Sequence, residues 1–216
     1  MSTEKAVQNK ESGHKENAPV EKLNTRDKIL ETSIELFAEK GFNGTTTKEI
    51  AEKAEVNEAL IFRHFSTKRE LYGAIIERKI EEEPGIETPL NEHKDSKDAR
   101  LIFTDIAERM FDKCGKDPSF IRLLHFSALE GHELSDMFFD TYVEYVNMLL
   151  SDYIEKRVSD KTFRKVNPFY ASQAFIGMLI NHIIERELFG AKNRNKTDEK
   201  EVIETFVSIF LNGIEA

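Results

Sequence analysis

The sequence of 216 residues predicts an all-α protein. From Asn24 onwards, apolar residues recur at helical spacing, as Leu30, Ile34 and Phe37 do. Helix-capping residues precede several of these segments, and glycine or proline separates them. No segment shows the convincing alternation of apolar and polar residues that is typical of a half-buried strand. Together these observations predict about nine helices.

The N-terminal part divides into an arm and a helical domain. Residues 1–23 are polar and charged, so they are predicted to be a disordered arm, with a DNA-contacting role left open. Residues 24–82 are predicted to form a domain that begins with a helix over 25–40. Gly41 follows that helix at the position where a left-handed residue commonly ends one.

Three further helix starts are marked by capping residues. Thr46 with Glu49 forms a capping box, and Thr67 with Glu70 forms a second one. Asn57 is a candidate N-cap for a short helix between them. The helix that begins after Thr67 is predicted to continue to about residue 82.

A linker is predicted at residues 83–97, which contain Pro84, Gly85, Pro89 and Asn91. A second domain, residues 96–216, then consists of long helices. Their predicted ranges are 96–114, 118–129, 134–158, 168–189 and 198–212.

Composition restricts the class of protein. Cys114 is the only cysteine, so no internal disulfide is possible, and a cytoplasmic location is expected. No apolar run is long enough to cross a bilayer, and the N-terminus lacks the pattern of a signal peptide. The sequence contains no glycine-rich phosphate loop, nucleophile elbow or zinc-ligand pattern. We therefore expect a protein that is not an enzyme and has no cofactor, metal or membrane partner.

The segment from Thr45 to Lys68 predicts a helix-turn-helix, since two short helices are joined by a three-residue turn. In this motif the second helix enters the major groove of DNA. The net charge of −9 opposes DNA binding, but helix N-termini offer free N–H groups to phosphates. The predicted DNA-binding residues are Thr46, Thr47, Lys48, Asn57, Glu58, Ala59, Leu60, Arg63, His64 and Lys68.

Residues 25–82 resemble the DNA-binding domain of the tetracycline-repressor-like (TetR) family. The resemblance rests on Ile29, Leu30, Leu36, Phe37, Lys40, Gly41, Phe42, Thr45, Thr46, Ile50, Ala51, Ala54, Val56, Phe62, Arg63, His64, Phe65, Lys68 and Leu71. It implies a homodimeric transcription regulator, usually a repressor, that binds a palindromic operator in double-stranded DNA. It also implies release from the operator by a small-molecule effector, base reading by the second short helix, and a phosphate contact from Lys68.

The sequence departs from the family pattern at three positions. Glu55 stands in the turn where glycine is common, Leu60 replaces a small or polar residue, and Phe62 replaces tyrosine. Phe62 lacks the hydroxyl that could donate to a phosphate. If the turn needs a positive φ, Glu55 costs about 0.5–1 kcal/mol relative to glycine.

The second domain is rich in aromatic residues, which favours a pocket for a largely apolar effector between its helices. For any single residue, an ordinary core position is the stronger interpretation. The pocket prediction therefore depends on the resemblance. Its candidates are Phe103, Met110, Phe111, Phe120, Phe138, Tyr142, Tyr145, Phe175 and Met178.

The last two predicted helices carry more apolar residues than one buried face requires, which favours pairing with a second copy. The alternative is burial within the monomer. The predicted dimer-interface residues are Ile180, Ile184, Ile203, Phe206 and Phe210.

The sequence favours a metal site and a function without DNA less. His125 and His132, with Glu130 and Glu133, do not follow a recognised metal-ligand spacing, so no metal site is predicted. A helical protein-interaction module without a DNA role remains the alternative function, and an enzyme is disfavoured further.

Overall fold

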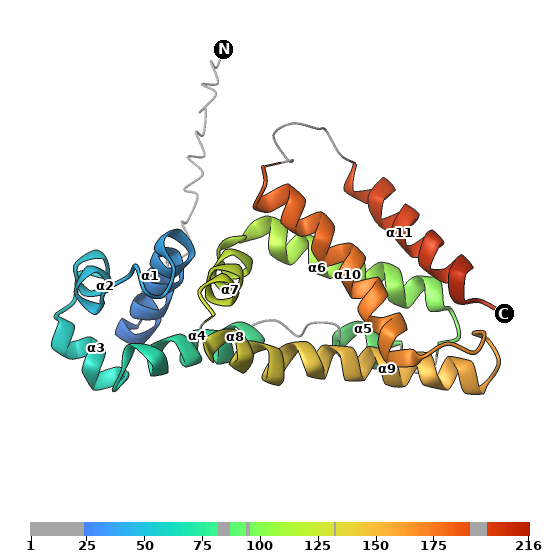
Figure 1. Cartoon of the computed structure of the whole chain (residues 1–216), viewed down its shortest axis with the longest axis horizontal. Coiled ribbons are helices and arrows are strands. Elements are labelled where there is room, and N and C mark those ends of the chain that lie inside the picture. The colour runs from blue at the N-terminus through green and yellow to red at the C-terminus, as the bar shows by residue number, and fades with distance from the viewer. Residues whose placement is uncertain (1–23, 82–86, 94–95, 132, 191–197) are drawn as a thin grey trace, which may run out of the picture.

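In the computed structural model, the described residues are 24–81, 87–93, 96–131, 133–190 and 198–216. Most of them lie in helices (Figure 1), and the extended pairing within these ranges is a single isolated bridge between Phe163 and Glu215. The predicted all-α fold is confirmed. The predicted arm, residues 1–23, lies outside the described residues. None of the described helices combines the length and the apolar character needed to cross a membrane.

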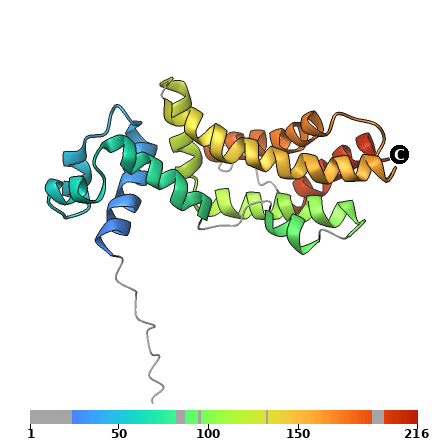
Figure 2. The same cartoon turned by 90° about the horizontal axis from the view of Figure 1, so that it is seen from below.

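The N-terminal head consists of α1 (Thr25–Lys40), α2 (Thr47–Lys53), α3 (Glu58–His64) and α4 (Lys68–Glu81). These bounds agree with the helices predicted from capping and periodicity. Figures 1 and 2 show the head at one end of an elongated molecule. Its core is made of buried apolar residues, which include Ile29, Leu30, Ile34, Phe37, Ile50, Ile61, Phe65, Leu71 and Ile75.

The capping boxes form to different extents. At α2, the Glu49 N–H donates to Thr46 Oγ1 (3.1 Å) and the Thr46 N–H donates to Glu49 Oε2 (2.9 Å). At α4, the Glu70 N–H donates to Thr67 Oγ1 (3.0 Å). The Glu70 carboxylate, however, accepts from Ser66 N–H (2.8 Å), one residue before the predicted donor. The first box is therefore confirmed, and the second is a shifted variant.

The C-terminal body begins with α5 and ends with α11. Its elements are α5 (Glu87–Glu92), α6 (Ala99–Lys116), α7 (Ser119–Leu129), α8 (Glu133–Phe138), a π-helical turn (Phe139–Val143), α9 (Glu144–Ser159), α10 (Pro168–Glu187) and α11 (Glu199–Ile214). Helices α6, α9, α10 and α11 surround the body core, whose largest fully buried side chains include Phe103, Phe163 and Phe175.

Two predictions for the body are wrong in detail. The predicted linker 83–97 contains helix α5, and Leu90 of that helix packs against the body core. The helix predicted over 134–158 is interrupted by the π-helical turn. Next to this turn, Asn147 Nδ2 donates to the Val143 carbonyl (3.0 Å), and Ser172 Oγ donates to Asn147 Oδ1 (3.0 Å). These polar contacts tie the start of α9 to α10.

The core of the head is completed by residues of the body. Leu123 of α7 is buried in it, and four partly buried residues of α7 and α8 pack against it: Phe120, Leu124, Met137 and Phe138. Figure 2 shows α7 and α8 between the head and the rest of the body. A movement within the body can therefore reach the head through α7 and α8.

Candidate nucleic-acid interface

The turn between α2 and α3 has the geometry of a helix-turn-helix. Ala54 ends α2, and the Val56 N–H donates to the Ala51 carbonyl (2.9 Å). Glu55 adopts a positive φ of 53°. This is the conformation that glycine, which is common at this position in the family, would favour. The Asn57 side chain caps α3 by accepting from the Ala59 N–H (2.9 Å), which confirms Asn57 as the N-cap.

Helix α3 is fixed to the head by its apolar side. Ile61 and Phe65 are buried in the head core, and Leu60 is half-buried. The Arg26 guanidinium lies 5.3 Å from the centroid of the Phe65 ring. The opposite side of α3 is therefore left for contact with another molecule.

The exposed residues of α3 include three of the predicted DNA-binding residues, Ala59, Arg63 and His64. Phe62 is also 48% exposed, although it is a large apolar side chain. This combination of a cation, an imidazole and apolar surface suits the edges and methyl groups of bases in a major groove. The predicted exposure of these three residues is confirmed, because the helical period separates them from the buried Ile61 and Phe65.

Several other predicted contact residues make structural contacts within the head. Thr47 Oγ1 donates to Glu58 Oε1 (2.6 Å), which joins the first turns of α2 and α3. Thr46 and Asn57 are exposed but act as helix caps. Their hydroxyl and amide groups are thus partly committed before any DNA is bound.

Most basic side chains near the motif are paired with carboxylates. Lys28 pairs with Glu55 (2.8 Å), Lys40 with Glu49 (2.9 Å) and Lys53 with Glu35 (2.9 Å); we call these the three head ion pairs. The hydrogen bond from Lys40, with the N–H of Thr46, lowers the pKa of Glu49 to about 2, so Glu49 stays charged. These pairs reduce the local positive charge that phosphates would meet.

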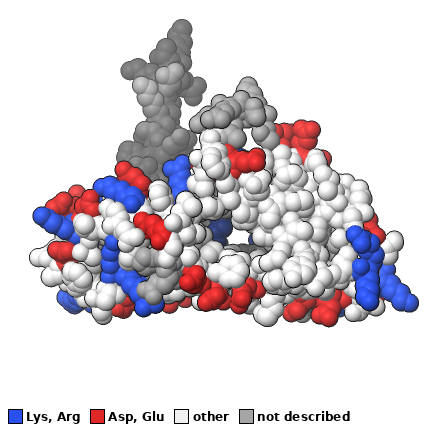
Figure 3. Space-filling model, in the orientation of Figure 1, with Lys and Arg blue, Asp and Glu red and all other residues white. Residues whose placement is uncertain are grey.

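Lys48 and Arg63 differ from those basic residues. Both are exposed, and within the described ranges neither has a carboxylate partner. Figure 3 shows basic and acidic side chains interspersed over the head, whereas acidic ones line the edge where Figure 1 places α8 and α9. Lys48 on α2 and Arg63 on α3 are therefore open to an approaching anion.

Lys68 is placed differently from the prediction. Its ammonium donates to the carbonyl of Phe42 and lies 4.0 Å from the centroid of the Phe42 ring. It is half-buried, and burial lowers its pKa. In this conformation the Lys68 ammonium is directed into the protein and is not presented to a phosphate.

Glu130 joins the body to the head, a role that the sequence did not predict for it. It caps the C-terminus of α7, and its Oε2 accepts from the Phe42 N–H (3.2 Å). It thus links the body to the turn after α1, 88 positions away in the sequence. Only tertiary folding brings these residues together, so no local pattern could have revealed the contact.

The nine predicted pocket residues are spread over the body core, the surroundings of the head core and two surface grooves. Met178 lines a groove between α10 and α11, Tyr145 lines a groove over α9, and the other seven line neither. Phe103, Phe111 and Phe175 are buried in the body core, with Met110 and Tyr142 packed against it. Phe120 and Phe138 pack against the head core instead. The assignment of these residues to an effector pocket therefore stays a prediction.

The predicted dimer-interface residues fall into a buried group and a half-buried group. Ile203 and Phe210 are buried in the body core of the monomer, and Phe210 also lines the groove between α10 and α11. Their assignment to the interface stays a prediction. Ile180, Ile184 and Phe206 are half-buried and remain accessible in part. The exposed residues of these helices include Tyr170, Ala174, Gly177, Ile209 and Gly213.

One carboxylate cluster could in principle hold a cation. Glu92, His93 and Asp105 lie close enough to share a metal ion. Arg109 already contacts both carboxylates, with Nε at 2.7 Å from Asp105 and Nη2 at 3.2 Å from Glu92. The Arg109 guanidinium therefore compensates one of the two negative charges of this cluster within the protein.

A helix-turn-helix with exposed cations, carried by an all-helical body, defines a DNA-binding transcription regulator. Comparison with known families agrees. The profile described as "Bacterial regulatory proteins, tetR family" matches residues 29–75. The profile described as "AefR-like transcriptional repressor, C-terminal domain" matches residues 103–213. The chain belongs to the TetR family.

A curated relative supports the same class, and solved structures share the fold. The chain is 28% identical over 194 residues to the HTH-type transcriptional regulator YvkB of Bacillus subtilis, covering 89% of this chain and 98% of YvkB. It resembles the regulator FadR of Bacillus subtilis, solved with stearoyl-CoA, with a TM-score of 0.71 and 17% identity over 88% of this chain and 99% of FadR. It also resembles AibR, solved with isovaleryl coenzyme A and operator DNA, with a TM-score of 0.65 and 18% identity over 86% of this chain and 97% of AibR. The prediction of a DNA-binding regulator rather than an enzyme is confirmed.

Proposed function

We propose that this protein is a homodimeric repressor that binds a palindromic operator and leaves it when a small molecule binds the body. The observation that carries this proposal is the exposed, unpaired state of Arg63 and Lys48 on the two helices of the motif. A phosphate or base can reach these cations without first breaking an ion pair. Most other basic residues nearby have carboxylate partners. The positive charge available to DNA is therefore concentrated at the motif, so an acidic chain can still bind DNA there.

In this proposal α3 enters the major groove and presents Ala59, Arg63 and His64 to base edges. Arg63 is suited to read guanine, because a guanidinium can donate two parallel hydrogen bonds to its O6 and N7. Lys48 and the N-terminus of α2 hold a phosphate. Lys68 reaches a phosphate only if its ammonium leaves the Phe42 carbonyl.

An electrophoretic shift with the DNA upstream of the protein's own gene tests operator binding. We expect Lys48→Ala to weaken binding to all sequences alike and to reduce the salt slope by about 1. We expect Arg63→Ala to cost about 1–3 kcal/mol and to change sequence preference. Lys53→Ala is the matched control, since Lys53 is paired with Glu35. Equal affinity of the wild type and both variants at moderate salt would contradict the proposal.

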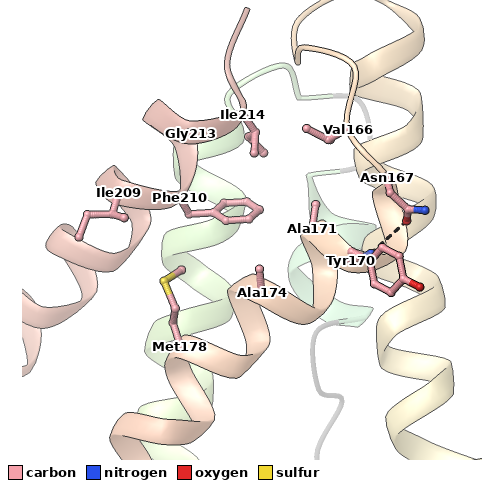
Figure 4. Close-up of a pocket in the computed structure, with 10 residues that line it drawn as sticks. All are labelled: Val166, Asn167, Tyr170, Ala171, Ala174, Met178, Ile209, Phe210, Gly213 and Ile214. Atoms are coloured by element: carbon pink, nitrogen blue, oxygen red, sulfur yellow. Dashed lines mark hydrogen bonds between the residues drawn. The ribbon is translucent and has the colours of Figure 1, made fainter.

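We propose that two copies pair through the exposed face of α10 and α11. This face borders an apolar groove of about 400 Å³ between the two helices (Figure 4), lined in part by Tyr170, Ala174 and Ile209. A side-chain methyl group added at Gly177 or at Gly213 would meet nothing within 4 Å, so another backbone can approach closely there. A twofold axis through this face would place the two heads on two half-sites of a palindrome.

Analytical ultracentrifugation tests the dimer. Ala174→Glu places a charge in the proposed interface and should convert the protein to monomers. Ala128→Glu makes the same change at an exposed alanine of α7 and should leave the dimer intact. A monomeric wild type, or a dimeric Ala174→Glu variant, would reject this interface.

For the effector, the support comes from the apolar and aromatic body and from the acyl-CoA compounds named in the FadR and AibR structures. We expect a largely apolar ligand whose binding weakens operator affinity by about 5–150-fold, the usual range of coupling between two sites. Stearoyl-CoA and isovaleryl-CoA are the first probes, with free coenzyme A as the control. Unchanged operator affinity with both would exclude these two acyl groups.

A further inference from the structure

A second groove, separate from the one between α10 and α11, lies on the outer side of α9. It has a volume of about 510 Å³ and lies over the π-helical turn, the first half of α9 and the start of α10. Six of its lining residues carry the argument below: Asp140, Glu144, Tyr145, Met148, Asp152 and Phe169. Its volume lies in the range of grooves that bind small organic molecules.

Three apolar side chains of this groove are open to solvent. Met148 is 52% exposed, Phe169 is 43% exposed and Tyr145 is 37% exposed. Two of them are aromatic rings, and the third carries a polarisable sulfur atom. Large apolar side chains that gather in a concave surface commonly mark a binding site, whereas isolated ones do not.

The charged residues of the groove are all acidic. Asp140, Glu144 and Asp152 line it, and within the described ranges none of them has a hydrogen-bond or ion-pair partner. Other acidic residues of the body are paired, such as Asp105 with Arg109 and Asp112 with Lys116. The groove therefore combines uncompensated negative charge with exposed aromatic surface.

We propose that this groove binds a hydrophobic organic cation that carries aromatic rings. Such a molecule can place its rings against Tyr145, Met148 and Phe169 while its positive charge faces the three carboxylates. The faces of aromatic rings attract cations as well, and the effect is stronger when the cation is weakly hydrated. A neutral ligand would leave the carboxylates uncompensated, and an anion would be repelled by them.

A compact metal ion does not fit this groove. Among the described residues, the carboxylates that approach closely enough to share an ion are those of the Glu92, His93 and Asp105 cluster. Asp140, Glu144 and Asp152 are not part of any such group. Spread charge suits a large cation with a delocalised or shielded charge, and it does not suit a divalent ion that demands several ligands at short distance.

Isothermal titration calorimetry of the full chain, without DNA, tests the inference with tetraphenylphosphonium as the cation. Triphenylphosphine oxide is the neutral analogue of similar shape. We expect the cation to bind once per protomer and about tenfold or more tighter than the analogue. Raising NaCl from 50 to 500 mM should weaken only the cation, since exposed charges are screened by salt.

A combined variant, Asp140→Asn with Glu144→Gln and Asp152→Asn, removes the charges and keeps the side-chain shapes. It should lose about tenfold or more in tetraphenylphosphonium affinity. The control carries Glu108→Gln, Glu155→Gln and Glu201→Gln, three exposed carboxylates outside the groove, and should bind as the wild type does. Phe169→Ala should weaken both the cation and the analogue. Circular dichroism confirms that each variant is folded.

Three outcomes would overturn the proposal: equal affinity for the cation and the neutral analogue, equal losses in the groove variant and its control, or no binding. A groove variant that changes the oligomeric state without changing cation affinity would identify the groove as a protein interface instead. Because the measurement needs neither operator nor effector, its result is independent of the proposed repressor function.

Discussion

Lys68 contacts Phe42 in two ways: its ammonium donates to the Phe42 carbonyl and also lies over the Phe42 ring, 4.0 Å from the centroid. The Phe42 ring in turn stacks on Phe37, with centroids 5.6 Å apart, and meets Tyr72 edge-on at 5.7 Å. The first residue of α4 thereby fixes the turn that follows α1. The role of Lys68 in the free protein is structural.

We predict that Lys68→Met lowers the free energy of unfolding by about 1 kcal/mol, because a charge-assisted hydrogen bond and a cation–π contact are lost and only part of this is offset by relief of burial. Chemical denaturation measures the change. Lys48→Met is the control, since Lys48 is exposed, and it should change stability by less than about 0.5 kcal/mol. Equal stability of the two variants would show that the contact with Phe42 contributes nothing.

Gly41→Ala should destabilise the protein by more than about 1 kcal/mol. Gly41 has a φ of +73°, and a Cβ there would lie 2.6 Å from Glu130 Oε1, so the change strains the backbone and displaces the Glu130–Phe42 contact. Gly73→Ala is the matched control within helix α4, where the new Cβ makes an ordinary 3.5 Å contact with Met137. It should stabilise by about 0.5–1 kcal/mol. Thermal unfolding of both variants decides whether position 41 requires glycine.

Glu55→Gly should raise the melting temperature, because glycine adopts the observed φ of 53° without strain, a gain of about 0.5–1 kcal/mol. The change also removes the exposed ion pair with Lys28, which contributes little and is weakened by salt. The increase should therefore be clearest in about 0.5 M NaCl. A lower melting temperature at that salt concentration would show that the turn does not strain Glu55.

Alkaline pH should destabilise the protein partly through Tyr72. Burial raises the pKa of Tyr72 to about 12, whereas an unfolded tyrosine ionises near pH 10. Between these values the unfolded chain has lost the proton that the folded protein keeps, so the contribution of Tyr72 to stability is complete below pH 10 and is lost as pH rises towards 12.

Tyr72→Phe should make the free energy of unfolding fall less steeply between pH 10 and 12 than in the wild type. Denaturation at several pH values measures the two slopes. Below pH 9 the difference between the proteins should not depend on the ionisation of Tyr72. Parallel curves across the whole alkaline range would contradict the raised pKa.

The parts of the fold that depend on local physics were predictable. The capping box at Thr46, the N-cap at Asn57 and the glycine after α1 are short-range signals, and each is found where the sequence placed it. The exposed face of α3 follows from the spacing of Ile61 and Phe65. These signals were enough to identify the helix-turn-helix and the family.

The parts that depend on tertiary contacts were not predictable. Helix α11 is apolar on more than one side, so periodicity could not tell which stripe faces the core; Ile203 and Phe210 proved to be on the buried one. The direction of the Lys68 side chain and the position of the nearby Glu130 both depend on the packing of α7 beside α1. The π-helical turn leaves no composition signal that separates it from an ordinary helix.

Leu123 of the body is buried in the core of the head, and this burial limits how the two domains can be exchanged between proteins. A chimaera that joins residues 24–81 to the body of another regulator would remove Leu123 and its neighbours Phe120 and Leu124 from the head. The grafted head would then expose apolar surface that no linker can cover. A functional exchange of sensing modules has to carry α7 and α8 along with the head, so the boundary for grafting does not lie at the chain position where the two domains meet.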